Sequence, residues 1–143
     1  MSLIFSIALS GLNAATRRLE VSASNVANAG SVGALPDPVT GKPGNPAPFQ
    51  PLTVSQQPLI GGGTSAAIVP LSPAFTPSFS PDSPFANAQG LVAAPNVDLV
   101  SERLDQLAAA NAYRANLRVL QVANELDKET IDSVGRPSTD LSA

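Results

Sequence analysis

The chain of 143 residues contains no cysteine and no histidine. Without cysteine it cannot form a disulfide, a thiolate metal site or a cysteine nucleophile. Without histidine it lacks the side chain most often used near neutral pH for proton transfer and for metal binding. A Ser-His-Asp triad within the chain is therefore excluded. These two absences argue against an enzyme more strongly than any motif in the chain argues for one.

Aromatic residues, charge and long apolar runs are also scarce. One tyrosine, five phenylalanines and no tryptophan offer little material for a single large core. A net charge of −3 gives no electrostatic basis for binding nucleic acid or anionic lipid. The apolar run at residues 3–15 is too short to span a bilayer, and Arg17 and Arg18 follow it, whereas the basic residues of a secretory signal peptide precede its apolar region. We therefore expect no cleaved signal and no direct membrane span.

Residues 1–29 have the pattern of one long helix. Large apolar residues recur every seven positions, and a small residue follows each of them three positions later. The large residues are Phe5, Leu12, Leu19 and Val26, and the small ones are Ala8, Ala15, Ser22 and Ala29. This is the a/d pattern of a coiled coil, and small d residues allow a partner backbone to come close. Gly11 costs about 1 kcal/mol of helix propensity relative to alanine, which favours a helix packed closely on a neighbour. We expect Gly30 to end the helix in a left-handed turn.

Residues 96–134 predict a second long helix, with Asn96 as its N-cap after Pro95. An ordinary surface helix has one apolar stripe, but this one has two. The first stripe comprises Val97, Val100, Leu104, Ala108, Ala115, Val119, Val122 and Leu126, and the second comprises Tyr113, Leu117, Leu120 and Ile131. We expect the first stripe to pack on the N-terminal helix. The second would be exposed in an isolated chain, so we expect other subunits to cover it.

Several polar residues allow two interpretations. Asp98, Glu102 and Asp105 share one helical face, as metal-binding or catalytic carboxylates would, but an acidic first turn favoured by the helix dipole is the interpretation that we prefer. Asn25 and Asn28 could either complete the end of the N-terminal helix or bond to backbone groups in a layer between subunits. Asn116, on the alanine-rich side of the second helix, is where a partner helix could approach.

The middle of the chain, residues 30–95, holds nearly all of the 14 prolines and little charge, which excludes a long helix. Residues 49–56 and 65–71, with Gly61-Gly62-Gly63 between them, predict a short β-hairpin. No Lys-Ser/Thr follows these glycines, so they do not form a phosphate-binding loop. Residues 70–85 are expected to be extended or polyproline-like.

Together these patterns predict a mainly α protein. Its N- and C-terminal helices, at 1–29 and 96–134, would pair as a coiled-coil axial domain. Residues 30–95 would form a projecting Pro/Gly-rich region of loops and a short hairpin, and residues 135–143 a flexible tail.

Three motifs resemble one family. Asn25-Val26-Ala27-Asn28 is similar to the Asn-Leu-Ala-Asn signature near the N-terminus of bacterial flagellar rod and hook proteins. Residues 80–102 resemble the segment leading into the last helix of proximal-rod members of that family. The sequence Tyr-Arg-Ala-Asn at 113–116 resembles the family's Tyr-Gln/Glu-Ala-Asn.

This resemblance implies a structural subunit of the proximal rod of the flagellar basal body, needing no cofactor. Such a subunit would polymerise through its terminal helices into a drive shaft that crosses the periplasm, transmits torque for cell motility and contains the export channel. The implied partners are copies of the chain, other rod proteins, the adaptor to the membrane ring and the flagellar type III export apparatus, with export requiring no cleaved Sec signal. The expected assembly contacts are Phe5, Leu12, Leu19, Asn25, Val26, Asn28, Asn96, Val97, Asp98, Leu104, Tyr113, Ala115, Asn116, Leu117, Val119, Leu120, Val122 and Leu126.

Two alternatives remain open from the sequence. One is a secreted binding module, in which residues 70–85 are a polyproline ligand and the helices form a dimerisation stem. The other is a different rod protein of the same family.

Overall fold

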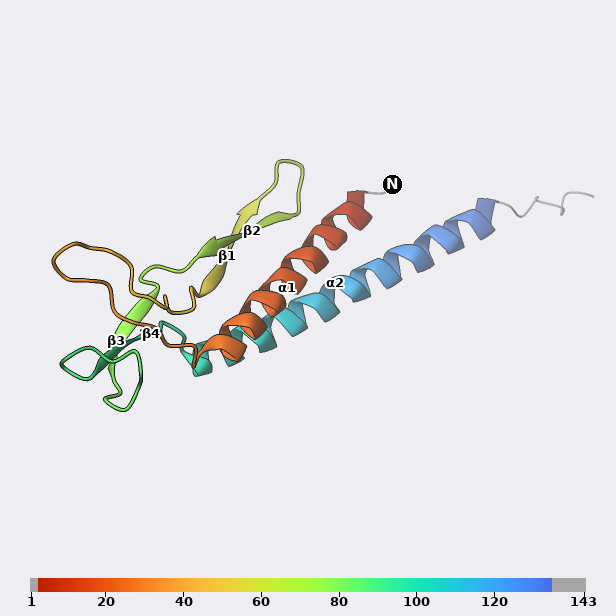
Figure 1. Cartoon of the computed structure of the whole chain (residues 1–143). Coiled ribbons are helices and arrows are strands. Elements are labelled where there is room, and N and C mark those ends of the chain that lie inside the picture. The colour runs from red at the N-terminus through yellow and green to blue at the C-terminus, as the bar shows by residue number, and fades with distance from the viewer. Residues whose placement is uncertain (1–2, 135–143) are drawn as a thin grey trace, which may run out of the picture.

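The computed structural model describes residues 3–134 and consists of two long helices with two small β-hairpins between them (Figure 1). The fold is therefore mixed but dominated by helix. The helices are α1 (Leu3–Asn28) and α2 (Leu99–Val134), and the strands are β1 (Leu52–Pro58), β2 (Thr64–Pro70), β3 (Phe75–Phe79) and β4 (Leu91–Pro95).

The two helices are antiparallel neighbours that meet at the hairpin end of the molecule (Figure 1). Neither helix contains proline, and Gly11 is their only glycine, so no proline interrupts either helix. The last described residue of α2, Val134, directly precedes Gly135. The predicted tail at 135–143 lies outside the described residues.

The C-terminal end of α1 differs from the prediction. Gly30 is not among the glycines with positive φ, so the left-handed glycine cap was wrong. Instead, the Asn28 carbonyl accepts a hydrogen bond from the Ser31 amide at 2.9 Å. The Asn28 side chain donates to the Ser24 carbonyl at 2.9 Å. Asn28 therefore completes the end of α1, which was one of the two interpretations drawn from the sequence.

The β1–β2 hairpin confirms that the middle region forms a short hairpin around the three glycines. Its strands pair antiparallel from Leu52 opposite Pro70 to Pro58 opposite Thr64. Gly61, Gly62 and Gly63 form the tip with φ of 92°, 100° and 88°, a left-handed region that side-chain-bearing residues rarely adopt.

A second hairpin, β3–β4, was not predicted. The polyproline interpretation of residues 70–85 is wrong for Phe75–Phe79, because these residues form β3 and pair with β4. Pro77 lies opposite Ala93, whose own N–H and C=O both pair with Gly33 at 2.9 Å. Since the backbone groups of Ala93 point away from β3, Pro77 is at a position where the ladder requires no N–H.

The core is thin and built mainly from small residues. Helix α1 packs against α2 and also against both strands of the β1–β2 hairpin. The buried apolar residues are Ala8, Leu12, Ala14, Ala15, Val21, Val92, Ala93, Ala109 and Ala123. Small residues let backbones lie close together, but most of the larger apolar side chains of the two helices, apart from Leu12 and Val21, lie outside the core.

Candidate assembly interface

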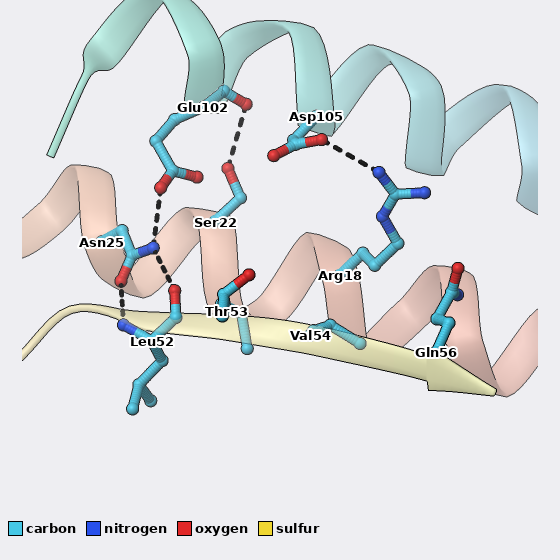
Figure 2. Close-up of a pocket in the computed structure, with 10 residues that line it drawn as sticks. Arg18, Ser22, Asn25, Leu52, Thr53, Val54, Gln56, Glu102 and Asp105 are labelled. Atoms are coloured by element: carbon cyan, nitrogen blue, oxygen red, sulfur yellow. Dashed lines mark hydrogen bonds and ion pairs between the residues drawn. The ribbon is translucent and has the colours of Figure 1, made fainter. Parts of the chain in front are cut away.

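Asn25, the first residue of the Asn-Val-Ala-Asn motif, ties three elements together (Figure 2). Its side chain is 1% exposed. The carboxamide donates to the Leu52 carbonyl at 2.8 Å and to the Glu102 carboxylate at 2.7 Å, and it accepts from the Leu52 amide at 3.0 Å. Asn25 thus joins α1 to α2 and β1 within one chain. This is neither of the two roles that were considered for it from the sequence.

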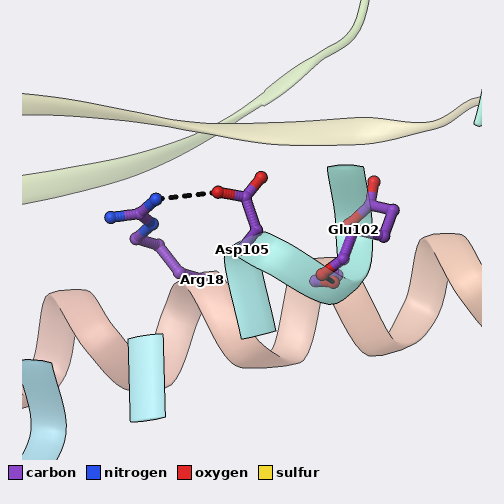
Figure 3. A network of polar contacts seen from close by, with 4 residues as sticks. Arg18, Glu102 and Asp105 are labelled. Carbon is purple, nitrogen blue, oxygen red and sulfur yellow. Dashed lines mark hydrogen bonds and ion pairs between the residues drawn. The ribbon is translucent and has the colours of Figure 1, made fainter. Parts of the chain in front are cut away.

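Two further polar contacts join the helices beside Asn25. The Ser22 hydroxyl donates to the Glu102 carbonyl at 3.0 Å. Arg18 forms an ion pair with Asp105 at 2.9 Å (Figure 3). Because both side chains of this pair are at least one-third exposed, solvent screening limits it to about 1 kcal/mol or less.

The three carboxylates at the start of α2 have separate structural partners. Asp98 bonds to its own helix end, Glu102 accepts from Asn25, and Asp105 pairs with Arg18. Within residues 3–134, no cluster of three or more His, Cys, Asp or Glu residues could hold a metal ion. Glu102 and Asp105 therefore join α2 to α1. Neither interpretation from the sequence, a metal-binding or catalytic cluster or an acidic first turn, had proposed this role.

Helices α1 and α2 meet along a seam of small or polar residues at seven-residue spacing. On α2 these are Glu102, Ala109, Asn116 and Ala123, and on α1 they include Ala15 and Ser22. Gly11, four positions before Ala15, also lies on the seam. The helices lie close together at Gly11, where an added Cβ would lie 2.4 Å from Asn116 Oδ1. The Asn116 amide is held by the Ala112 carbonyl at 2.8 Å. Asn116 therefore faces α1 of its own chain.

The start of α2 is capped by Asp98, so the prediction of Asn96 as N-cap was wrong. Asp98 accepts hydrogen bonds from the Val100 amide at 2.9 Å and the Ser101 hydroxyl at 3.0 Å. Asn96 instead donates its side-chain amide to the Pro73 carbonyl at 3.0 Å, which fastens the β3 end of the second hairpin to the helix entry. The Val97 amide donates to the Pro95 carbonyl at 2.8 Å and precedes the helix.

The Asp98 cap predicts a local acid transition. The bond from the Val100 amide, followed by that from Ser101, holds the pKa of Asp98 below its ordinary value of 3.8. A depressed carboxyl pKa stabilises the fold above that ordinary value, and the contribution is lost as pH falls through the folded-state pKa. We expect the first turn of α2 to fray as the pH falls through this lowered pKa, which lies below the ordinary value of 3.8. Amide chemical shifts of Val100 during an acid titration measure this fraying. In Asp98→Asn, which keeps an acceptor oxygen, the same shifts should be independent of pH over this range.

The predicted large residues of the α1 heptad do not all pack inside. Leu12 is buried and Phe5 half-buried, but Leu19 and Val26 are 45% and 40% exposed. Of the predicted small residues, Ala8, Ala15 and Ser22 are buried, whereas Ala29, just beyond the end of α1, is half-buried. The helices therefore approach closely at the small heptad residues. The larger residues Leu19 and Val26 are left at the edge of this contact.

The first stripe of α2 does not pack on α1 as predicted. Val119, Val122 and Leu126 are 46%, 47% and 55% exposed, and Leu104 is 63% exposed. Ala115 is also exposed. The physical reason is the small-residue seam: α1 contacts the strip between the two apolar stripes, so that the stripes lie on either side of it.

The second stripe is partly covered. Leu120 is half-buried, whereas Tyr113 and Leu117 are 43% and 40% exposed. From Asn124 to Ser133 every residue is exposed, so nothing within residues 3–134 covers the last turns of α2.

Two apolar grooves border the seam. The distal groove, about 470 Å³, lies between Ile4 of α1 and the Val119, Val122 and Leu126 side chains of α2. The tyrosine groove, about 430 Å³, is lined by Leu19, Ala109 and Tyr113 among others. Both grooves run where another helix could insert apolar side chains between α1 and α2. No helix in the described range is apolar over a sufficient length to cross a membrane.

Two family descriptions match the helical regions. Residues 5–34 match "Flagella basal body rod protein", and residues 88–133 match "Flagellar basal body rod FlgEFG protein C-terminal". The chain is 38% identical over 132 residues to the flagellar basal-body rod protein FlgC of Yersinia enterocolitica, with 90% of this chain and 93% of the relative covered. It is 35% identical over 133 residues to FlgC of Salmonella typhimurium, with the same coverage, and 31% identical over 132 residues to that of Agrobacterium fabrum, with 88% and 89% covered.

Long helices with uncovered apolar faces are typical of a structural subunit of a larger assembly, and the matched family and relatives are structural rod proteins and not enzymes. The chain belongs to the FlgC family of flagellar basal-body rod proteins. The motifs at both ends of the chain therefore identified the family correctly.

Proposed function

We propose that this chain is a subunit of the proximal rod that polymerises through α1 and α2, with the β-hairpins projecting from the helical shaft. The observation that carries the proposal is the row of half-exposed apolar residues on both sides of the α1–α2 seam. In a rod, neighbouring subunits would cover these residues and fill the distal and tyrosine grooves. The seven-residue spacing of the seam supports a coiled-coil-like pairing within the axial domain.

The energetics favour several neighbours per subunit. Covering a half-exposed Val or Leu gains about 1 kcal/mol, half of what full burial provides. Five such residues on one stripe would gain about 5 kcal/mol, which barely offsets the roughly 4–15 kcal/mol that association costs. Stable incorporation therefore requires contacts on more than one face, as in a helical array where each subunit has neighbours along and around the axis.

Other rod proteins, the adaptor to the membrane ring and the export apparatus are the further partners that we propose. We also propose that the subunit crosses to the periplasm without losing its N-terminal segment. Residues 3–15 form the first half of α1, and Gly11, Leu12 and Ala15 of that segment pack inside the fold. Cleavage there would remove half of the helix that α2 and the first hairpin require. In the assembled shaft, torque would pass through many packed side chains and not through one contact.

The polyproline-ligand alternative has little support, because Phe75–Phe79 is paired in β3. Deleting residues 70–85 would therefore remove a hairpin strand from the fold and not a free ligand.

Val122→Asp tests the proposed interface. Val122 is 47% exposed, so the substitution should leave the fold intact but place a charge in the distal groove, and we expect loss of rod assembly and of swimming. Soft-agar motility and the recovery of the subunit in isolated basal bodies measure the effect. Gln121→Asp, an exposed neighbour outside that groove, is the matched control and should swim normally. Normal motility of Val122→Asp, with the protein present in rods, would contradict the proposal.

A further inference from the structure

The outer edge of strand β1 is only partly occupied. The N–H and C=O of Leu52 both bond to the Asn25 side chain, so they point away from β2. Backbone groups alternate direction along an antiparallel strand. Those of Val54 and Gln56 therefore point to the same side as those of Leu52. Among residues 3–134 neither pair has a hydrogen-bonding partner on that side.

The other edge of the same hairpin is fastened to α1. The Thr64 amide donates to Ser10 Oγ at 3.1 Å, and the Ala66 carbonyl accepts from the Arg17 guanidinium at 2.9 Å. The fold thus anchors the β2 edge and the first position of the β1 edge. It leaves the Val54–Gln56 portion as an open edge, which is a ready template for another strand.

A polar groove of about 200 Å³ follows this open edge (Figure 2). It lies between β1 and the first turns of α2, and α1 runs along it. The residues that line it beside the strand are Arg18, Val21, Ser22, Glu102 and Asp105. Asn25 also lines the groove, and its carboxamide offers the same donor and acceptor as a peptide group. The contact of Asn25 with Leu52 therefore displays the chemistry that fits this edge: an amide lying alongside β1.

We propose that an extended segment of a second copy of this chain adds to β1 at Val54 and Gln56 and continues the pairing that Asn25 begins at Leu52. This inference rests on the proposed function, which places copies of the chain side by side. Positions 54 and 56 are about 6.6–6.8 Å apart along the strand, so a segment of about three residues could complete the bonds. Strands β2, β3 and β4 are already paired within their own hairpins, so none of them occupies this edge of β1.

Hydrogen exchange of individual amides in isolated rods tests this pairing. In the free chain, Val54 and Gln56 should exchange fast and Thr53 and Ser55, whose amides face β2, should be protected. In rods, we expect exchange at Val54 and Gln56 to slow at least tenfold, with little change at Thr53 and Ser55. Exchange at Val54 and Gln56 that is as fast in rods as in the free chain would overturn the inference but leave the proposed function intact. Absence of the chain from rods would overturn both.

Site-directed cross-linking identifies the occupant. Because the chain has no cysteine, a photoreactive maleimide on Val54→Cys labels that position alone. Irradiated rods should yield a cross-link between two copies of the chain. A cross-link only to a different rod protein would overturn the assignment to a second copy.

Val54→Pro removes an N–H that the hairpin does not use, so the free chain should keep its circular dichroism spectrum while incorporation into rods falls at least tenfold. Gln56→Pro should behave in the same way. Thr53→Pro, which removes an N–H that pairs with β2, should disrupt the hairpin itself. Normal incorporation of both edge variants would overturn the proposal, and the exchange measurement decides it if either variant fails to fold.

Discussion

Replacing Asn25 with alanine is expected to lower the free energy of unfolding by about 3 kcal/mol. The substitution removes the partner of the Leu52 N–H, the Leu52 C=O and the Glu102 carboxylate at once. A buried polar group left without a partner costs roughly 1–3 kcal/mol, and water entering the polar groove would recover part of the total. Urea unfolding of the purified chain, followed by circular dichroism, measures the change.

The aspartate variant separates hydrogen bonding from packing. In Asn25→Asp the side chain still accepts from Leu52 but no longer donates, and its carboxylate faces that of Glu102. The repulsion should raise the pKa of Asp at this position, so the variant should be most stable in acid and lose stability as pH rises through the ordinary carboxyl range. Adding Glu102→Gln should restore much of the loss near pH 7.

Asn28→Ala is the matched control for Asn25, since within residues 3–134 the Asn28 side chain bonds only to Ser24 and Ser31, which are nearby in the sequence. We expect it to cost less than about 1 kcal/mol. Equal effects of Asn25→Ala and Asn28→Ala would contradict the bridging role of Asn25.

Gly11→Val should be the second strongly destabilising change, by about 2–3 kcal/mol. Even the first carbon of a side chain would lie 2.4 Å from Asn116 Oδ1, so the helices must separate or Asn116 must leave its rotamer. Shortening Asn116 to alanine should relieve the clash, so that the double variant loses less stability than Gly11→Val alone. Urea unfolding of the four chains of this cycle gives the coupling.

Gly30→Val is the control for glycine replacement. No atom lies within 4 Å of its added Cβ, and Gly30 does not have positive φ, so we expect a change of less than about 0.5 kcal/mol. Additive effects of Gly11→Val and Asn116→Ala would show that the two residues do not limit the approach of the helices.

The sequence predicted the two helices and the first hairpin because their signals are local. Long stretches without proline, and three glycines between two apolar runs, determine secondary structure with little help from the rest of the chain. The second hairpin was missed because Pro77 looks incompatible with a strand. The register of β3 on β4 makes that position acceptable, because it places Pro77 opposite Ala93 where the ladder requires no N–H, and this register depends on residues distant in the sequence.

The choice of packing face was the main error about the helices. Helical periodicity identified Val119, Val122 and Leu126 as one apolar stripe, and the expectation that the largest apolar side chains meet inside then assigned that stripe to α1. In the structure the helices instead approach through Gly11, Ala109 and other small residues. Gly11 had indicated the correct packing face, since a glycine allows a neighbouring helix to approach closely.

Most of the polar contacts between elements could not be predicted from the sequence. Arg18 and Asp105 are 87 positions apart, and no spacing rule brings them together. Asn25 was recognised as important through its motif, but its partners on β1 and α2 depend on how the hairpin lies against α1. Its role therefore became visible only with the tertiary structure.

The fastening of the β1–β2 hairpin has a mechanical consequence. Ser10, Arg17 and Asn25 hold it at three points over about four turns of α1, or roughly 22 Å of the helix. The hairpin therefore stiffens this part of α1, because bending the helix here would require several hydrogen bonds to break together. A subunit built in this way would deform first in the last turns of α2, which no hairpin in the described part of the chain supports, and would stay rigid near the hairpins.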